Sequence, residues 1–189
     1  MGMLLNKEDR INQYKNFMSY RKPLYPVRVE VLEALGFFTA PASTRFHGAY
    51  EGGLFDHSLA VARELVKLTE KLGLTWERPE SPYIVGMFHD LCKCDNYVKI
   101  DTLEEVVPVS VKYKYSPDII IPGHGDKSVI MLQKYSELTD EEIACIRWHM
   151  GAYETDTKMW EYYGRAIEKY PNVLYTHTAD MIASKIMGV

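Results

Sequence analysis

The sequence lacks a long apolar run, and its amino terminus becomes charged within seven residues. We therefore expect neither a signal peptide nor association with a membrane. Cysteine is also scarce: Cys92, Cys94 and Cys145 are too few for a disulfide framework, so we expect a cytoplasmic protein with reduced thiols. Cys92 and Cys94 form a C-x-C pair, but with one further cysteine we favour ordinary buried or half-exposed thiols over a thiolate metal site.

Strong positive charge is absent as well, because the formal net charge is −4. Proteins that hold long nucleic acid usually carry a basic patch, so we expect long RNA or DNA not to be a partner. A small anionic substrate remains compatible with this balance, since bound metal cations would reverse the local charge. Internal repeats and low-complexity tracts are missing too, and 189 residues fit a single domain.

Helical patterning dominates the sequence. Apolar residues at helical spacing predict helices over 23–36, 54–73, 81–93, 139–151, 157–169 and 172–187. Gly36 stands where the first of them should end. Thr139 and Glu142 form a capping-box signature, and Ser81 and Asp126 are candidate N-caps. We therefore predict a mainly α fold.

One segment departs from the helical pattern. Residues 97–116 alternate in polarity and are rich in valine and tyrosine, and a Pro/Gly turn follows them. We predict a small β-hairpin insertion around 97–121, placed between helices.

Several polar side chains occupy apolar helical stretches. The segment "MFHDLCK" places His89 and Asp90 among apolar residues, and His57, His149 and Asp180 have similar surroundings. A single inward histidine is usually satisfied by a neighbour in the core. Several of them together with two aspartates favour a shared cation, because each isolated buried polar group costs on the order of a few kcal/mol. Imidazole and carboxylate are good ligands for divalent metals.

Five motifs in order carry a family resemblance: "GGLFDHSLAVA", "FHDLCK", "PGHGDKS", "IRWHMG" and "HTADMIAS". They resemble the HD-domain superfamily of metal-dependent phosphohydrolases, especially small phage or bacterial HD hydrolases and the HD domain of 3′–5′ exoribonucleases. The resemblance implies an HD-domain helical bundle forming one domain over 1–189. Its motif-bearing part would cover about 45–187, with helices of 1–44 packed on it.

The resemblance also implies a centre of one or two divalent metals. The implied ligands are His57, His89, Asp90, His124, His149 and Asp180. Asp90 would bridge the two metals, with His124 and His149 on the second, because a carboxylate can span two cations. Manganese, iron, nickel, cobalt and zinc all accept such ligands, and magnesium is an option for the second site.

Asp90 and Lys93 are the candidate catalytic residues, and Lys93 would stabilise phosphate charge or orient Asp90. An equally open interpretation makes Lys93 a solvated lysine at a helix end. We further expect four side chains near the ligands to contact substrate: His47, Lys127, Arg147 and His177. His177 also suits a role behind a ligand, and a loop histidine such as His47 is often merely exposed.

The resemblance implies hydrolysis of a phosphomonoester or phosphodiester by metal-activated hydroxide, and we expect the substrate to be a nucleotide. Two alternatives stay open. Some HD-fold proteins with the same ligands hold a mixed-valence di-iron centre and act as oxygenases. Others are non-enzymatic modules that sense a nucleotide. The ligand residues alone do not separate the first alternative from hydrolysis.

Overall fold

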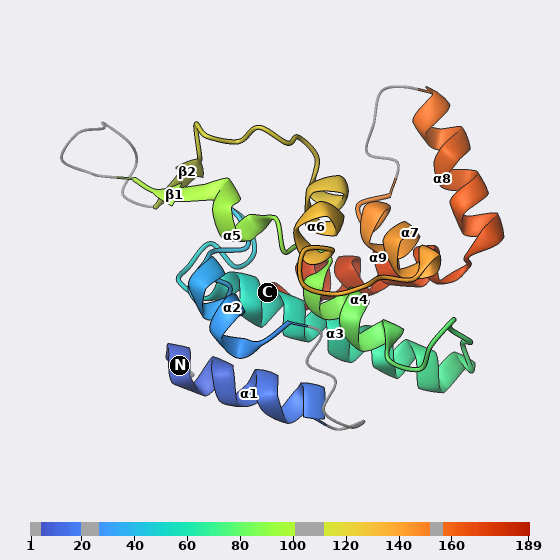
Figure 1. The fold of residues 1–189 in the computed structure, drawn as a ribbon, viewed down its shortest axis with the longest axis horizontal. Coiled ribbons are helices and arrows are strands. Elements are labelled where there is room, and N and C mark those ends of the chain that lie inside the picture. Colours follow the sequence, from blue (N-terminus) through green and yellow to red (C-terminus); the bar gives the residue numbers. More distant parts are fainter. Residues whose placement is uncertain (1–4, 20–26, 101–111, 152–156) are drawn as a thin grey trace.

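In the computed structural model, the described residues are 5–19, 27–100, 112–151 and 157–189. They form a mainly helical structure with one small sheet, which confirms the predicted fold class (Figure 1). The elements are α1 (Lys7–Ser19), α2 (Val29–Leu35), α3 (Gly53–Leu72), α4 (Ser81–Phe88), α5 (Lys93–Asn96), β1 (Tyr97–Lys99), β2 (Tyr113–Tyr115), α6 (His124–Leu132), α7 (Asp140–Arg147), α8 (Thr157–Lys169), α9 (Asn172–Met181) and the π-helix η1 (Ile182–Met187). None of the helices in these ranges combines the length and the apolar character needed to cross a membrane.

Local signals set several helix ends. Gly36 closes α2 in the left-handed conformation, with φ 80°, as predicted. The capping box at the start of α7 is also confirmed: Glu142 N–H donates to the Thr139 hydroxyl at 3.2 Å, and Thr139 N–H donates to the Glu142 carboxylate at 3.0 Å. The two other predicted caps are wrong. Ser81 is the first residue of α4 and donates to Glu142, and Asp126 lies inside α6, which begins at His124.

The helix predicted over 81–93 is interrupted at His89 and Asp90. α4 ends at Phe88, and α5 starts at Lys93. Between them, Leu91 N–H donates to the carbonyl of Phe88 at 3.1 Å and Lys93 N–H to that of Asp90 at 2.9 Å. These short-range bonds wind the chain more tightly than an α-helix. The turn therefore directs His89 and Asp90 into the interior from a point between two helices.

The predicted β-hairpin is confirmed in its paired part. β1 and β2 run antiparallel, with Tyr97 opposite Tyr115 and Lys99 opposite Tyr113. The rest of the predicted segment differs: residues 101–111 lie outside the described residues, and the chain after Tyr115 leaves the sheet for turns that lead to α6.

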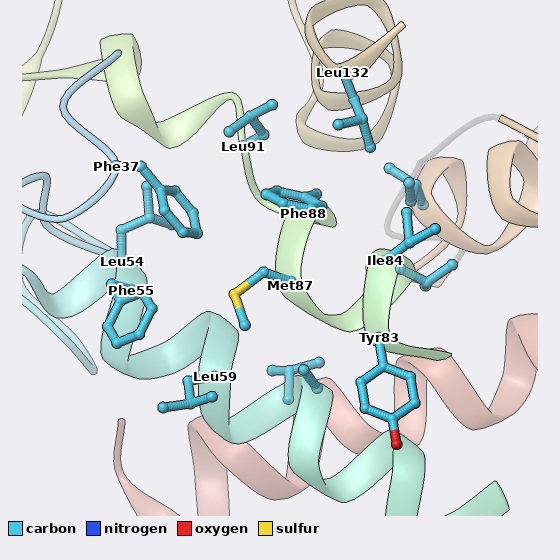
Figure 2. Packing of buried hydrophobic residues seen from close by; sticks show 14 of the residues in the cluster. Phe37, Leu54, Phe55, Leu59, Tyr83, Ile84, Met87, Phe88, Leu91 and Leu132 are labelled. Atoms are coloured by element: carbon cyan, nitrogen blue, oxygen red, sulfur yellow. The ribbon is translucent and has the colours of Figure 1, made fainter. Parts of the chain in front are cut away.

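The core forms around α3, which packs against α4, α9 and η1. Figure 2 shows Met87 of α4 pointing toward Phe55 and Leu59 of α3, while Phe88 lies nearer Leu91 in the same cluster. The N-terminal helices belong to the same hydrophobic cluster through residues such as Tyr14, whose ring meets that of Phe88 edge to face. One continuous hydrophobic core therefore holds α4 in place, and the turn after α4 carries His89 and Asp90.

α3 and α4 approach each other closely at a glycine. A Cβ atom at Gly86 would overlap the backbone of Ala62, so only hydrogen fits between the two helices there. Gly86 precedes His89 by one turn, and Ala62 lies in α3 shortly after His57. The close crossing brings the two histidine-bearing segments together.

Candidate metal centre

Six polar side chains from separate segments meet inside the helical bundle. They are His57 from α3, His89 and Asp90 from the turn after α4, His124 from the first position of α6, His149 from just beyond α7, and Asp180 from α9. All are buried except His124, which is half-buried. The structure thus brings together every side chain that the family resemblance implied as a metal ligand. Their role as ligands stays a prediction.

The first group of atoms surrounds one small volume. Nε2 of His57 lies 3.3 Å from Nε2 of His89 and 3.2 Å from Oδ1 of Asp180. Oδ2 of Asp90 lies 3.6 Å from the same His57 nitrogen and 3.4 Å from that of His89. Ligands bound to a common metal at about 2.0–2.2 Å stand roughly this far apart. The arrangement therefore fits a single cation.

A second group faces the other oxygen of Asp90. Its Oδ1 lies 3.5 Å from Nδ1 of His124 and 3.4 Å from Nε2 of His149. All three atoms are buried, and none has a hydrogen-bond partner among the described residues. Buried polar atoms without a partner are rare and costly in native proteins. A cation held by these three atoms would satisfy all of them.

Hydrogen bonds on the far side of the rings fix which nitrogen faces the centre. Nδ1 of His57, His89 and His149 each contacts a main-chain carbonyl, at 2.9, 2.8 and 2.7 Å. A carbonyl only accepts hydrogen bonds, so each Nδ1 carries the proton. In the neutral ring, Nε2 then presents a lone pair to the centre. Metal-bound histidines are commonly oriented in this way.

Lys93 contributes positive charge beside the group. Its Nζ lies 2.5 Å from Oδ2 of Asp90, and both side chains are buried. Burial alone would lower the pKa of Lys93, but the charge of Asp90 and the hydrogen bond to it raise that pKa above its ordinary value. Burial likewise opposes ionisation of Asp90, but the ammonium of Lys93 acts together with His89, His124 and His149 to hold the pKa of Asp90 well below its usual range. The pair is therefore ionised, not the solvated lysine of the alternative interpretation.

An ion pair next to His57 ties α1 to α3. The Arg10 guanidinium donates two hydrogen bonds to Asp56, at 2.9 and 3.0 Å, and the Tyr50 hydroxyl donates to the same carboxylate at 3.0 Å. Gly52 leaves room for this contact, since a Cβ atom there would overlap the guanidinium. The sequence gives no local signal for the Arg10–Asp56 pair, because the two residues are 46 positions apart and only the fold brings them together.

His47 lies beside the centre, as a substrate contact would require. Its ring centroid is 5.0 Å from that of His57. Burial lowers the pKa of His47 to about 4, so its ring is neutral at physiological pH. It is therefore a neutral donor or acceptor next to the first group of ligands.

Lys127 and Arg147 have partners within the protein. The Lys127 ammonium is buried and lies 2.6 Å from Asp95, and it donates to the Asn96 side chain at 2.7 Å. The Arg147 guanidinium pairs with Asp126 and covers the ring of Trp148, 4.3 Å from its centroid. Phosphate contact by either residue stays a prediction, and it would compete with these carboxylates.

His177 and Val189 contact two of the candidate ligand residues on the side away from the centre. Nδ1 of His177 donates to the main-chain carbonyl of His149 at 2.7 Å, which suits a role behind a ligand. The main-chain oxygen of Val189 is the acceptor that fixes the ring of His57. No side-chain pattern announces a main-chain acceptor, so the sequence could not reveal the part played by Val189.

Comparison with known proteins agrees with this geometry. The HD domain family matches residues 54–183, which span all six side chains. The chain therefore belongs to the HD domain family, within a superfamily of metal-dependent phosphohydrolases. No curated protein and no solved structure matches the chain significantly.

Proposed function

We propose that this protein hydrolyses a phosphomonoester or phosphodiester bond at a centre of two divalent cations. The placement of Asp90 carries the proposal. Its Oδ2 faces His57 and His89, whereas its Oδ1 faces His124 and His149. A carboxylate shared in this way suits two cations about 3.5–4 Å apart, the spacing of two-metal hydrolases.

Each residue of the centre has a defined task in this proposal. Bound divalent cations would lower the pKa of a coordinated water and polarise the phosphate oxygens. His57, His89 and Asp180 hold the first position, and His124 and His149 hold the second. Neutral imidazoles with two carboxylates suit manganese, iron, nickel, cobalt or zinc, with magnesium an option in the second position.

Lys93 has two tasks in the proposed reaction. Its ammonium keeps Asp90 ionised and in place, since the two groups are in direct contact. It also supplies a buried positive charge at the centre, where a phosphate would enter. A positive charge held away from water acts more strongly than one at the surface.

We propose a small phosphorylated substrate, most simply a nucleotide. The acidic overall balance disfavours long nucleic acid. The neutral ring of His47 stands beside the first group of ligands, where it could form a hydrogen bond to the substrate.

Phosphate release from a panel of nucleotides and phosphodiesters, with several divalent metals, tests the proposal. We expect turnover by the wild type and a loss of several orders of magnitude in Asp90→Ala, which removes a ligand from both positions. His149→Ala should lose metal from the second position alone. Metal content and circular dichroism, measured on the same samples, separate loss of the centre from loss of the fold.

Three results would contradict the proposal. Near-wild-type turnover by Asp90→Ala would exclude the two-cation centre as the source of the rate. Oxygen consumption by iron-loaded protein with a mixed-valence paramagnetic signal, and no phosphate release, would replace hydrolysis with oxygenase activity. Tight nucleotide binding without any turnover would indicate a sensor.

A further inference from the structure

Cys92 lies beside Asp90 and His124, two of the candidate ligands, although no role in the proposed reaction requires it. It occupies the turn between α4 and α5, two residues after Asp90, and it is fully buried. Its sulfur belongs to a set of three possible ligand atoms, with Asp90 and His124, that all lie within 4.8 Å of one another. A sulfur at this separation can share a cation with the other two side chains.

Unpartnered buried atoms point to the same place. Oδ1 of Asp90 and Nε2 of His149 belong to buried side chains, lie 3.4 Å apart and have no hydrogen-bond partner among the described residues. Nδ1 of His124 is in the same condition. These atoms indicate a cation independently of the cysteine, so the cysteine is not the sole sign of a ligand here.

A hydrogen bond from a neighbouring side chain supports the sulfur of Cys92. Nδ2 of Asn96 donates to Sγ of Cys92, with 3.5 Å between the two atoms. The Asn96 amide is oriented by its other end, because its oxygen accepts from the Lys127 ammonium at 2.7 Å. The amide nitrogen must therefore face the sulfur. Hydrogen bonds that support a ligand atom from behind are typical of protein metal sites.

We propose that Cys92 Sγ is a ligand of the second metal, together with Asp90 and His124. The thiol loses its proton to solvent when the metal–sulfur bond forms. A soft thiolate favours zinc, cobalt or iron(II) and disfavours magnesium, so this cysteine would determine which metal the second position selects. The assignment rests on the proposed metal centre but not on the reaction that it performs.

Cobalt(II) binding tests the assignment without any substrate, because a cobalt–thiolate bond gives a sulfur-to-metal charge-transfer band in the near ultraviolet. Metal-free wild type, Cys92→Ser, Cys92→Ala and Cys145→Ser would be titrated with cobalt, and bound cobalt and absorption would be measured together. Cys145 is the matched control, since it is a buried cysteine outside the possible ligand sets found in the described residues. We expect the band in the wild type and in Cys145→Ser, and its loss in both Cys92 variants, which keep cobalt in the first position.

Each other outcome counts against the assignment. Cobalt bound to the wild type without the band would overturn the thiolate ligand while leaving the metal centre intact. A band that persists in both Cys92 variants would assign the bond to another cysteine. Failure of the wild type to bind cobalt at all would overturn both the assignment and the centre. Circular dichroism of the two Cys92 variants checks that they are folded, so that the loss of the band is not a result of unfolding.

Discussion

Asp90 and Lys93 form the most tightly confined pair of charges at the centre. Their side chains are 2% and 6% exposed, so water screens neither of them. Two charges taken out of water depend on each other, and removing one partner usually destabilises a protein by about 3–5 kcal/mol. Bound cations would offer Asp90 a second source of compensation. The dependence on Lys93 should therefore vary with the metal content of the protein.

We predict that Lys93→Met lowers the thermal stability of the metal-free protein far more than that of the metal-loaded protein. Methionine keeps most of the volume but leaves Asp90 without its counter-ion, a loss of about 3–5 kcal/mol in the metal-free form. Metal binding should restore much of that loss, because cations then neutralise the carboxylate. Melting curves with chelator and with manganese or zinc measure the difference.

Lys7→Met is the matched control for this prediction. Lys7 pairs with Glu33 at 2.8 Å, and the two side chains are 49% and 35% exposed, so the change should cost less than about 1 kcal/mol in either form. An equal loss of stability by Lys93→Met with and without metal would show that the centre does not neutralise Asp90.

The candidate ligands could be found from single residues, whereas their supports could not. His57, His89 and Asp180 stand out because polar side chains interrupt apolar helical patterns. Arg10 and Val189 show no such contrast. One is an ordinary charged residue of an N-terminal helix, and the other acts through its main chain. Only the folded arrangement identifies such partners.

At the scale of elements, the crossing of α3 and α4 sets the distance between the first two histidines. Gly86 permits the crossing, because any side chain at that position would overlap the backbone of Ala62. The carbonyl oxygen of Gly86 also accepts a hydrogen bond from Nδ1–H of His89, with 2.8 Å between nitrogen and oxygen. One glycine thus serves both the packing of the helices and the orientation of a candidate ligand.

We predict that Gly86→Ala separates the two helices and weakens both folding and metal binding. The added methyl group must displace backbone, not a flexible side chain, and overpacking of this kind typically destabilises by about 1–3 kcal/mol. Gly164→Ala is the matched control. Gly164 lies in α8 with open space around it, so alanine should stabilise that helix by about 0.5–1 kcal/mol. Denaturant unfolding and metal titration of both variants measure the two effects.

If Gly86→Ala kept wild-type stability and metal affinity, the close crossing would not position His57 and His89. Helices themselves were predictable here, since periodicity and the Thr139–Glu142 capping box are local signals. The break after Phe88 was not, because the propensity of residues 81–93 favours one continuous helix.

At the scale of the whole molecule, the centre joins segments that are remote in the sequence. The candidate ligands extend from His57 to Asp180 and come from both sides of the β-hairpin insertion. The mainly helical class could be predicted from the sequence because apolar residues recur at helical spacing. The family resemblance could be recognised from the five motifs and their order. The proximity of Cys92 to Asp90 and His124 could not be predicted, because the spacing of the three cysteines does not show which side chains lie near the sulfur of Cys92.

Metal binding should therefore stabilise the fold as a whole, with a defined pattern of local protection. A cation that binds only the folded state at one hundred times its dissociation constant adds about 2.7 kcal/mol to the free energy of unfolding. For a chain of this length, that corresponds to a rise of roughly 5–10 °C in Tm. We expect chelator to remove this gain and manganese or zinc to restore it.

Hydrogen exchange would locate the gain, because amides near the ligands should exchange more slowly when metal is bound. Protection is expected in the first half of α3, in the turn after α4, at the start of α6 and in α9. α8 is an internal control, since it supplies no candidate ligand and has no buried residue. Equal slowing in α8 and α3 would indicate a general tightening, not a cross-link through the centre. Slowing confined to the ligand-bearing segments would show that the metal joins elements that the hydrophobic core alone leaves freer to open.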